Sequence, residues 1–575
     1  MSEYIFWLKR LRVCPRILIY LHKIYLKLSG FIYLQINKAD LSFILFFTYF
    51  FSNNKKMQRL VSGSIIDNWL DYINMYNRYS TYKVKVATTS IVMLFFFTPV
   101  VSNVNAQEFD EWKKEHKGEF QDFKDKRDVE FLKMLEEVWV QVDGIETKPT
   151  FEDPKIENIP RAEGSLFKLN TSDGKENEER VTVKKLTGYS KPNELVAGTN
   201  SLQSNSNPTG SVASELIFYD VKVPFYYFPN NIVKLQGSPN KDALKTYWEE
   251  MSKTEYNLLL DRLSLAIQQM NLNDWGVFNL SYKLGEDIYG NSENNIRLFV
   301  WFMMTKLGYE IKTGFNTTQV YLLMPSKNRI SNTSFFTLKG RRYYVFDTGD
   351  IFLRPGRLTT YDGQYPNSNK TFSLSANKIP VLPDSTQMRN VRFTWEKKEY
   401  SFDVPYNKNI IDYYRRFPTS DLHIYTMAEN SNKTLQALHD NLGTIIKEKS
   451  PEEALNILLR FVQTAFKYKT DVDQFGKQKF MLPEEIFYYS YSDCDDRAIL
   501  FAFLVNHLLG YDVIGLRYPG HLATAVNIKN TLQGDSFTYN GKKYVVADPT
   551  YINSTLGMSM PKFRRISPEI TNLFY

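Results

Sequence analysis

Cysteine is almost absent from this 575-residue sequence, which has two, Cys14 and Cys494. The sequence also has only six histidines, none spaced as a metal-binding pair, and it contains no CxxC motif and no glycine-rich phosphate-binding loop. Zinc ribbons, dithiol redox centres and P-loop nucleotide sites all need such patterns. We therefore expect neither a metal ion nor a cofactor.

Long hydrophobic runs are also missing near the start of the chain, where no apolar stretch reaches the roughly 20 residues of a membrane-spanning helix. Residues 75–106 instead combine a basic start, a short apolar segment and a small-residue cleavage site before Gln107. This pattern predicts a signal peptide and an exported protein. Because signal peptides lie at the true N-terminus, we interpret residues 1–74 as a doubtful leader with a mis-called start. An uncleaved membrane anchor at residues 91–101 is the alternative.

The chain carries almost no net charge once the leader and the signal peptide are removed. Residues 1–106 hold 13 of the 71 basic and 4 of the 63 acidic residues, so 58 and 59 remain. Charge therefore predicts no nucleic-acid partner, and contact with a membrane only through an uncleaved signal segment. Cleavage also removes Cys14. An exported chain with Cys494 alone forms no internal disulfide, and this thiol is either reactive or buried and inert.

Two regions precede the larger part of the chain. Residues 107–185 begin with aromatic and aliphatic residues near helical spacing, and we expect an amphipathic helical region there. It either docks on a following domain or forms a self-associating stalk. Residues 186–214 are rich in Ser, Asn, Gly and Thr and are typical of a linker.

Chemistry-bearing residues concentrate near the C-terminus. Apolar residues recur at helical spacing over 498–509, and Gly510 ends the run, so Cys494 lies at the start of a predicted helix. His521 follows a Pro-Gly turn and opens an alternating run, whereas Asp548 closes a second one. If these two strands pair antiparallel, His521 and Asp548 lie side by side, and a helix packed on them brings Cys494 close.

Such a grouping supplies a nucleophile, a base and an orienting acid. A free thiol has a pKa near 8.5, and a neighbouring imidazolium together with a helix N-terminus lowers this pKa. The carboxylate of Asp548 would fix the imidazole tautomer. Three further acids, Asp493, Asp495 and Asp496, would raise the thiol pKa if they faced the sulfur. We expect them to cap the helix or to pair with Arg497 instead.

Three short motifs resemble those of the transglutaminase-like superfamily of cysteine enzymes: SDCDDRA, GH at a strand start and DPT at a strand end. The resemblance spans about residues 435–551 and includes an approach helix, a Tyr- and Asp-containing connection and a Pro-Glu segment. It implies an α+β, papain-like domain with the cysteine on a helix packed on an antiparallel sheet, at residues 381–575. It further implies a catalytic triad of Cys494, His521 and Asp548. It identifies neither the substrate nor the group that completes the oxyanion hole.

The sequence also repeats itself. LGYE at residues 307–310 matches LGYD at 509–512, and GRRYYVFDTGD at 340–350 matches GKKYVVADPTY at 541–551. At these offsets of 202 and 201 residues, Ser292, Gln319 and Asp347 take the places of Cys494, His521 and Asp548. Because Ser292 and Gln319 supply neither a thiol nor a general base, residues 215–380 are predicted to be a degenerate, non-catalytic copy.

Two functions of different classes follow. The first is an exported cysteine hydrolase or acyl transferase that acts on amide bonds of a protein or peptide substrate, with peptidase action favoured over cross-linking. Water outnumbers acceptor amines outside the cell, and no acceptor site is recognisable in the sequence. The alternative is a non-catalytic surface binding or assembly module built from two related domains. Neither reading specifies an oligomeric state.

Overall fold

The computed structural model describes residues 126–147, 159–162, 180–184, 209–348, 353–528 and 533–574. These residues all belong to one compact unit, Glu119–Tyr575. The predicted leader and signal peptide lie outside the described residues, as does most of the predicted linker. Antiparallel sheets and separate groups of helices make up the described part, so the fold is mixed α and β, consistent with the expected α+β class.

The first half of the unit contains a hairpin, four α-helices that follow it and a sheet, besides a helix at residues 126–137. The hairpin is β3 (Val212–Phe218) and β4 (Val221–Tyr227), and the helices are α8 (Lys241–Lys253), α9 (Asn257–Gln269), α10 (Asp274–Tyr289) and α11 (Glu293–Lys306). The sheet contains β1 (Trp139–Asp143), β2 (Ile145–Glu146), β5 (Lys312–Phe315), β6 (Val320–Met324), β7 (Ser334–Leu338), β8 (Arg341–Phe346) and β9 (Arg357–Tyr361). Its strand order is β1-β9-β5-β6-β8-β7-β2.

The second half repeats this plan with more helices. Its hairpin is β10 (Thr386–Trp395) and β11 (Lys398–Asn407). Its α-helices are α12 (Lys408–Tyr414), α13 (Leu422–Thr426), α14 (Asn432–Leu438), α15 (Thr444–Ile446), α16 (Pro451–Thr464), α17 (Asp471–Phe475), α18 (Glu485–Tyr488) and α19 (Cys494–Leu504). The short strands β12 (Lys467–Tyr468) and β13 (Tyr491–Ser492) pair in parallel. The sheet contains β14 (Val513–Tyr518), β15 (His521–Val526), β16 (Ser536–Tyr539), β17 (Lys542–Ala547) and β18 (Glu569–Asn572) in the order β16-β17-β15-β14-β18.

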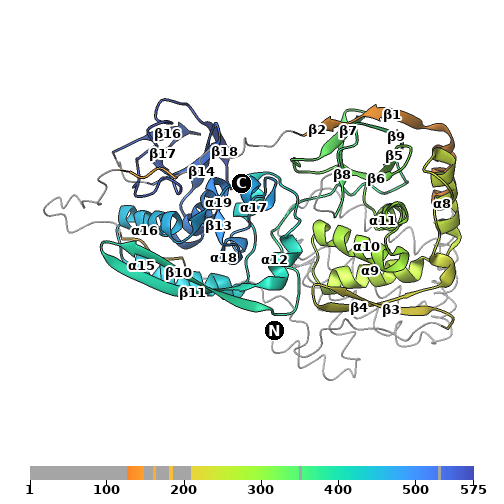
Figure 1. Cartoon of the computed structure of the whole chain (residues 1–575), viewed down its shortest axis with the longest axis horizontal. Helices are drawn as coiled ribbons and strands as arrows, with labels where there is room; N and C mark the ends of the chain where they lie inside the picture. The colour runs from red at the N-terminus through yellow and green to blue at the C-terminus, as the bar shows by residue number, and fades with distance from the viewer. Residues whose placement is uncertain are drawn as a thin grey trace, which may run out of the picture. The chain divides into compact units, whose positions relative to one another are not determined.

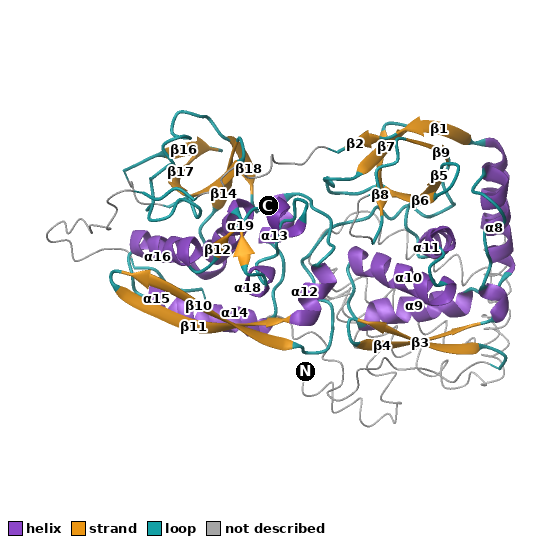
Figure 2. Cartoon of the chain, viewed as in Figure 1, coloured by secondary structure: helices purple, strands orange, loops and turns teal. Residues whose placement is uncertain are grey.

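Each half is layered, with helices between its hairpin and its sheet (Figure 1). In the second half α16 contacts both β10 and α19, and α19 contacts β15. In the first half α10 contacts both β3 and α11, and α11 contacts β6. Figure 2 shows the two hairpins and the two sheets in orange, with the purple helices between them. Each sheet therefore buries one face against the helix that leads into it.

The two sheets share strand order and register. Read from one edge, β9-β5-β6-β8-β7 corresponds to β18-β14-β15-β17-β16. Leu322 pairs with Phe346 between β6 and β8, and Thr524 pairs with Ala547 between β15 and β17. The first partners differ by 202 residues and the second by 201, and the next two pairs along each ladder differ likewise. These displacements are the ones that the sequence match predicts.

The helical prediction for residues 107–185 is wrong for the described residues that follow residue 137. Residues 126–137 are helical, but Trp139–Asp143 form β1, which pairs with β9 at the sheet edge. The run WVQVD alternates and carries β-branched and aromatic residues, which favour a strand once an edge is available to pair with. Residues 159–162 and 180–184 are not helical either, since Ala162 N–H donates to the Ile552 carbonyl at 2.8 Å and Val181 N–H to the Lys449 carbonyl at 2.9 Å.

The predicted linker does not separate two independent domains. β1 and β2 precede it in sequence, yet they form both edges of the sheet whose other strands follow it. Its last residues, from Val212, belong to β3 rather than to a linker. Hydrogen bonds also join the two halves, because Trp275 Nε1 donates to the Tyr413 carbonyl at 3.1 Å and Val381 N–H to the Met270 carbonyl at 2.8 Å.

Within the described ranges, no helix has the length and hydrophobicity to cross a membrane.

Candidate active site

Cys494 is the first residue of α19, as predicted from the apolar run that follows it. The helix begins with a capping box. Asp493 accepts the N–H groups of Asp495 and Asp496 at 3.0 and 3.3 Å, and the carboxylate of Asp496 accepts the Asp493 N–H at 3.2 Å. These bonds satisfy donors that a helix start leaves unpaired. Two of the three flanking acids therefore cap the helix, as expected.

His521 and Asp548 meet as the strand pattern predicts. His521 is the first residue of β15, and Asp548 follows the last residue of the neighbouring strand β17. His521 Nε2 lies 2.9 Å from Asp548 Oδ2, and both side chains are almost fully buried. The other oxygen, Asp548 Oδ1, accepts the N–H groups of Thr550 and Tyr551 at 3.0 and 3.2 Å. The carboxylate is thus oriented by its own turn and holds the Nε2–H tautomer of the imidazole.

A polar stripe on α16 supports the turn after Asp548. Asn456, Arg460 and Gln463 lie at helical spacing i, i+4 and i+7. Asn456 Oδ1 accepts the Leu556 N–H at 2.9 Å, and Arg460 donates to Asn553. Gln463 Nε2 lies 2.8 Å from the Tyr551 carbonyl, 3.2 Å from the Asp548 carbonyl and 3.0 Å from Ser554 Oγ. Gln463 is 1% exposed, so these contacts lie inside the protein.

Arg497 links α19, the helix that begins at Cys494, to Gln463 of α16. Its guanidinium donates to the carbonyls of Phe466 and Gln463 at 2.8 and 3.4 Å and to Ser492 Oγ at 3.3 Å. The expected pairing of Arg497 with the flanking acids is not among its hydrogen bonds or ion pairs in the described structure. Burial lowers the pKa of Arg497 to about 10. Sequence reasoning missed both Gln463 and Arg497 as supports, because their partners are backbone carbonyls distant in sequence.

The thiol of Cys494 contradicts one expectation. It donates to Asp495 Oδ1 at 3.6 Å, so Asp495 faces the sulfur. Burial raises the pKa of Cys494 well above its ordinary value, and the charges of Asp495 and Asp493 raise it further. A hydrogen bond from the backbone N–H of Leu522 opposes this rise. The physical reason for the contact is local: the carboxylates of Asp493 and Asp496 are used in the capping box, whereas Asp495, the residue after Cys494, takes no part in it with its side chain.

Cys494 lies on a helix that contacts β15, and no hydrogen bond joins it to His521 in the described structure. Leu522, whose N–H bonds to the sulfur, directly follows His521 on β15. His521 Nδ1 is buried and has no hydrogen-bond partner among the described residues. Its Nε2 is engaged by Asp548, so Nδ1 is the nitrogen left to accept a proton. His521 and Asp548 are thus brought together, and Cys494 lies at the residue that follows His521, with its thiol turned toward Asp495.

The site is closed. Cys494, His521 and Asp548 are 1%, 2% and 1% exposed. Phe563 stacks on the His521 ring at a centroid distance of 5.0 Å and an interplanar angle of 4°, and on Tyr518 at 4.6 Å. Phe563 itself is buried. A polymeric substrate cannot reach the thiol in this arrangement.

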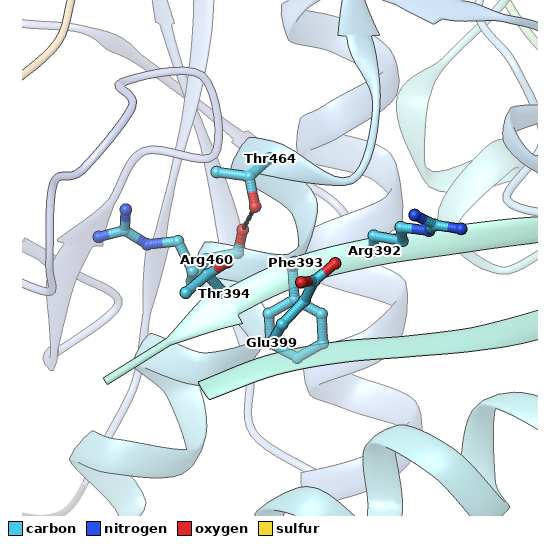
Figure 3. Close-up of a pocket in the computed structure, with 6 residues that line it drawn as sticks. All are labelled: Arg392, Phe393, Thr394, Glu399, Arg460 and Thr464. Atoms are coloured by element: carbon cyan, nitrogen blue, oxygen red, sulfur yellow. Dashed lines mark hydrogen bonds between the residues drawn. The ribbon is translucent and has the colours of Figure 1, made fainter. Parts of the chain in front are cut away.

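An open pocket of about 240 Å³ lies elsewhere, on β10, β11 and α16 (Figure 3). It includes none of Cys494, His521 and Asp548, although Arg460 of the polar stripe on α16 lines it. Its six lining residues are Arg392, Phe393, Thr394, Glu399, Arg460 and Thr464. Figure 3 shows the two guanidinium groups directed to opposite sides, with Glu399 between them. The two cations therefore do not converge on one anion.

The predicted counterparts in the first half occupy equivalent places without forming an equivalent site. Ser292 precedes α11, Gln319 precedes β6 and Asp347 follows β8. Ser292 Oγ accepts from Asn295, and Gln319 accepts from Tyr321. Asp347 instead lies 3.2 Å from Tyr282 Oη and 3.7 Å from Arg297, and burial raises its pKa. No interaction within the described residues joins these three side chains to one another.

Three buried carboxylates near Cys494 could in principle hold a cation: ligand atoms of Asp471, Asp493 and Asp496 lie within 4.8 Å of one another. Their oxygens are largely used by the backbone. Lys479 N–H donates to Asp471 at 2.8 Å and Met481 N–H to Asp496 at 2.9 Å, in addition to the capping box. Burial and the charges of neighbouring aspartates raise the pKa of all three carboxyls. Structural capping accounts for this cluster.

Comparisons with known proteins add no assignment: no family model matches the chain, and neither curated proteins nor solved structures include a significant match.

Proposed function

We propose that this protein is an exported cysteine hydrolase or acyl transferase that acts on amide bonds of protein or peptide substrates, with hydrolysis as its main reaction. In this proposal residues 381–575 have the transglutaminase-like, papain-like fold, and Cys494, His521 and Asp548 are the catalytic triad. The observation that carries the proposal is the buried His521–Asp548 pair at 2.9 Å, with His521 Nδ1 unpartnered among the described residues and the Cys494 sulfur bonded to the N–H of Leu522, the next residue.

The chemistry follows from the positions of the side chains. His521 Nδ1 takes the thiol proton, and the Cys494 sulfur attacks the carbonyl carbon of the substrate, whose π electrons move to oxygen. When the carbon–nitrogen bond breaks, the imidazolium returns the proton to the leaving amine. A water molecule, deprotonated by His521, then hydrolyses the thioester. Asp548 holds the imidazole in the Nε2–H tautomer throughout.

Two movements are required before this reaction. The thiol must turn from Asp495 toward His521 Nδ1, which is a rotation about the side-chain bond of Cys494. The aromatic cover centred on Phe563 must also shift, because the triad is buried. Export rests on the signal-peptide pattern and the protein or peptide substrate on the family resemblance of the sequence. The preference for hydrolysis rests on the excess of water over acceptor amines outside the cell.

The first half has a supporting role in this proposal. Shared strand order and matching register support a common origin of the two sheets, and the missing thiol and imidazole argue against catalysis in the first. We assign it to substrate selection. Replacing its residues 215–380 without a change in substrate preference would contradict that role.

The alternative is a non-catalytic binding or assembly module, and one observation favours it. The thiol bonds to a carboxylate and has a raised pKa, which is the opposite of an activated nucleophile. Under this alternative, Cys494→Ala leaves the biological activity unchanged. Under the enzyme proposal, the same substitution abolishes it.

The rate of alkylation of Cys494 against pH separates the two functions. The full chain carrying Cys14→Ser has one thiol, so iodoacetamide labels Cys494 alone. A thiolate–imidazolium pair predicts rapid labelling well below pH 8.5 that is lost in His521→Ala. A rate that rises only above pH 8.5 in both proteins would overturn the enzyme proposal. His423→Ala, which changes a histidine on α13, is the matched control and should label as the parent protein does.

A further inference from the structure

Tyr468 lies next to the entrance of the cysteine helix. It is the last residue of β12, and it pairs in parallel register with Ser492 of β13. Ser492 stands two residues before Cys494, and only the N-cap residue Asp493 separates β13 from α19. A backbone ladder thus fixes Tyr468 beside the segment that presents the sulfur.

The hydroxyl of Tyr468 is a buried donor without an acceptor. Its oxygen is inaccessible to solvent and has no hydrogen-bond partner among the residues that the structure describes. Buried hydroxyls are nearly always bonded, because leaving one unpaired costs free energy. An orphan donor beside a nucleophile is therefore explained if its acceptor arrives with the substrate.

The surroundings of the hydroxyl point to the thiol. Burial raises the pKa of Tyr468 strongly, and among charged groups the Cys494 sulfur raises it most, followed by Asp493 and Asp495. The Arg497 guanidinium lies over the Tyr468 ring, 5.4 Å from its centroid. Arg497 is itself fixed by backbone carbonyls, so the ring is held in place from one side. A fixed donor near the sulfur suits a charge that develops on an atom bonded to the carbon under attack.

We propose that Tyr468 Oη donates a hydrogen bond to the oxyanion formed when Cys494 attacks a carbonyl group. This inference rests on the proposed cysteine chemistry and names a catalytic residue for it. The sulfur–carbon bond forms, the carbonyl π electrons move to oxygen, and Tyr468 stabilises that oxygen without giving up its proton. When the leaving group departs, the carbonyl re-forms and the hydrogen bond weakens. The donor thus acts in the transition state more than in the ground state.

The test is Tyr468→Phe in the full chain carrying Cys14→Ser. The change removes one oxygen and keeps the ring that packs beside Arg497. The probe is p-nitrophenyl acetate: a thiolate attacks its carbonyl carbon, p-nitrophenolate leaves and an acyl-enzyme forms. Loss of one oxyanion donor slows such steps by about 10²- to 10³-fold. We expect this loss in the acylation rate, whereas alkylation by iodoacetamide, which forms no oxyanion, keeps its rate and pH profile.

A control variant and the outcomes below distinguish a failure of this inference from a failure of the proposed function. Tyr539→Phe, on edge strand β16 and against the same apolar cluster as Tyr468, should acylate at the parent rate. Acylation of Tyr468→Phe at the parent rate would overturn the oxyanion role and leave the proposed function intact. A parent protein that is alkylated rapidly but never acylated would overturn both. Equal loss of alkylation and acylation in Tyr468→Phe, with an unchanged thermal unfolding midpoint, would assign the hydroxyl to the thiol and overturn the inference.

Discussion

The Cys494 thiol donates to Asp495 Oδ1 at 3.6 Å, although both residues start a helix whose backbone N–H groups favour a thiolate. The carboxylate and the helix dipole therefore act on the sulfur with opposite signs. Burial adds to the effect of the carboxylate. Burial is the largest cause of the raised thiol pKa, and Asp495 contributes the largest charge effect.

Replacing Asp495 should activate the thiol. Asp495→Asn removes a negative charge beside the sulfur, and the pKa of Cys494 falls because the thiolate is no longer repelled. One pKa unit corresponds to a tenfold change in thiolate fraction, and we expect alkylation at pH 7 to be on the order of tenfold faster. The pH–rate profile measures this shift. Asp512→Asn, which changes an exposed partner of Lys542, is the control and should leave the profile in place.

Much of the second half could be predicted from residue patterns. Helical spacing after Cys494, the turn before His521 and the strand before Asp548 are local signals, and local signals determined these elements. The repeat offsets also predicted the register shared by the two sheets. Each of these predictions depends on residues close together in sequence or on matching sequence motifs.

The parts that escaped prediction depend on distant partners. β1 forms because β9, more than 200 residues away, offers an edge to Trp139–Asp143. Gln463 lies in a largely apolar helix, and sequence reasoning gave it no role. The polar residues at i, i+4 and i+7 on α16 are a signal that could have indicated its supporting role. The contact of Asp495 with the sulfur and the cover by Phe563 depend on side-chain packing that no spacing rule contains.

The buried acid cluster should make stability depend on pH. Burial and the charges of Asp493 and Asp496 raise the pKa of Asp471 well above 3.8. A carboxyl whose pKa is raised by folding stabilises the protein fully below its unfolded pKa, and this contribution is lost as pH rises through the folded pKa. Asp471→Asn keeps an acceptor for Lys479 N–H without the charge. We expect a higher unfolding midpoint at pH 8 and little change near pH 4.

Calorimetry at the two pH values tests that sign. Asp403→Asn, an exposed acid on β11, serves as the control and should shift neither midpoint. A midpoint for Asp471→Asn that drops at pH 8 would mean that the charge is compensated in the folded protein.

Gln463 should be needed to hold the turn that carries Asp548. Gln463→Leu keeps a side chain of similar volume but removes the hydrogen bonds from Nε2 to the Asp548 and Tyr551 carbonyls, each of which keeps a backbone donor, at a cost of about 0.5–1.5 kcal/mol in the free energy of unfolding. A displaced Asp548 also orients His521 less well, so the alkylation profile should move toward that of His521→Ala. Thr464→Ala, an exposed neighbour on α16, should change neither quantity. Destabilisation with an unchanged profile would make Gln463 a structural residue alone.

Phe563 should control access to the thiol. Its ring covers His521 at 5.0 Å and lies in the apolar cluster on the outer face of the second sheet. Phe563→Leu keeps an apolar side chain but loses the stacked ring, so small reagents reach Cys494 more often. We expect faster alkylation by iodoacetamide, by about threefold to tenfold, at every pH, because opening changes the fraction of accessible molecules and not the thiol pKa. Phe537→Leu, which packs against the same cluster from β16, is the matched control. A rate change confined to one side of the pH profile would show that Phe563 acts on the protonation of His521 or Cys494 rather than on access.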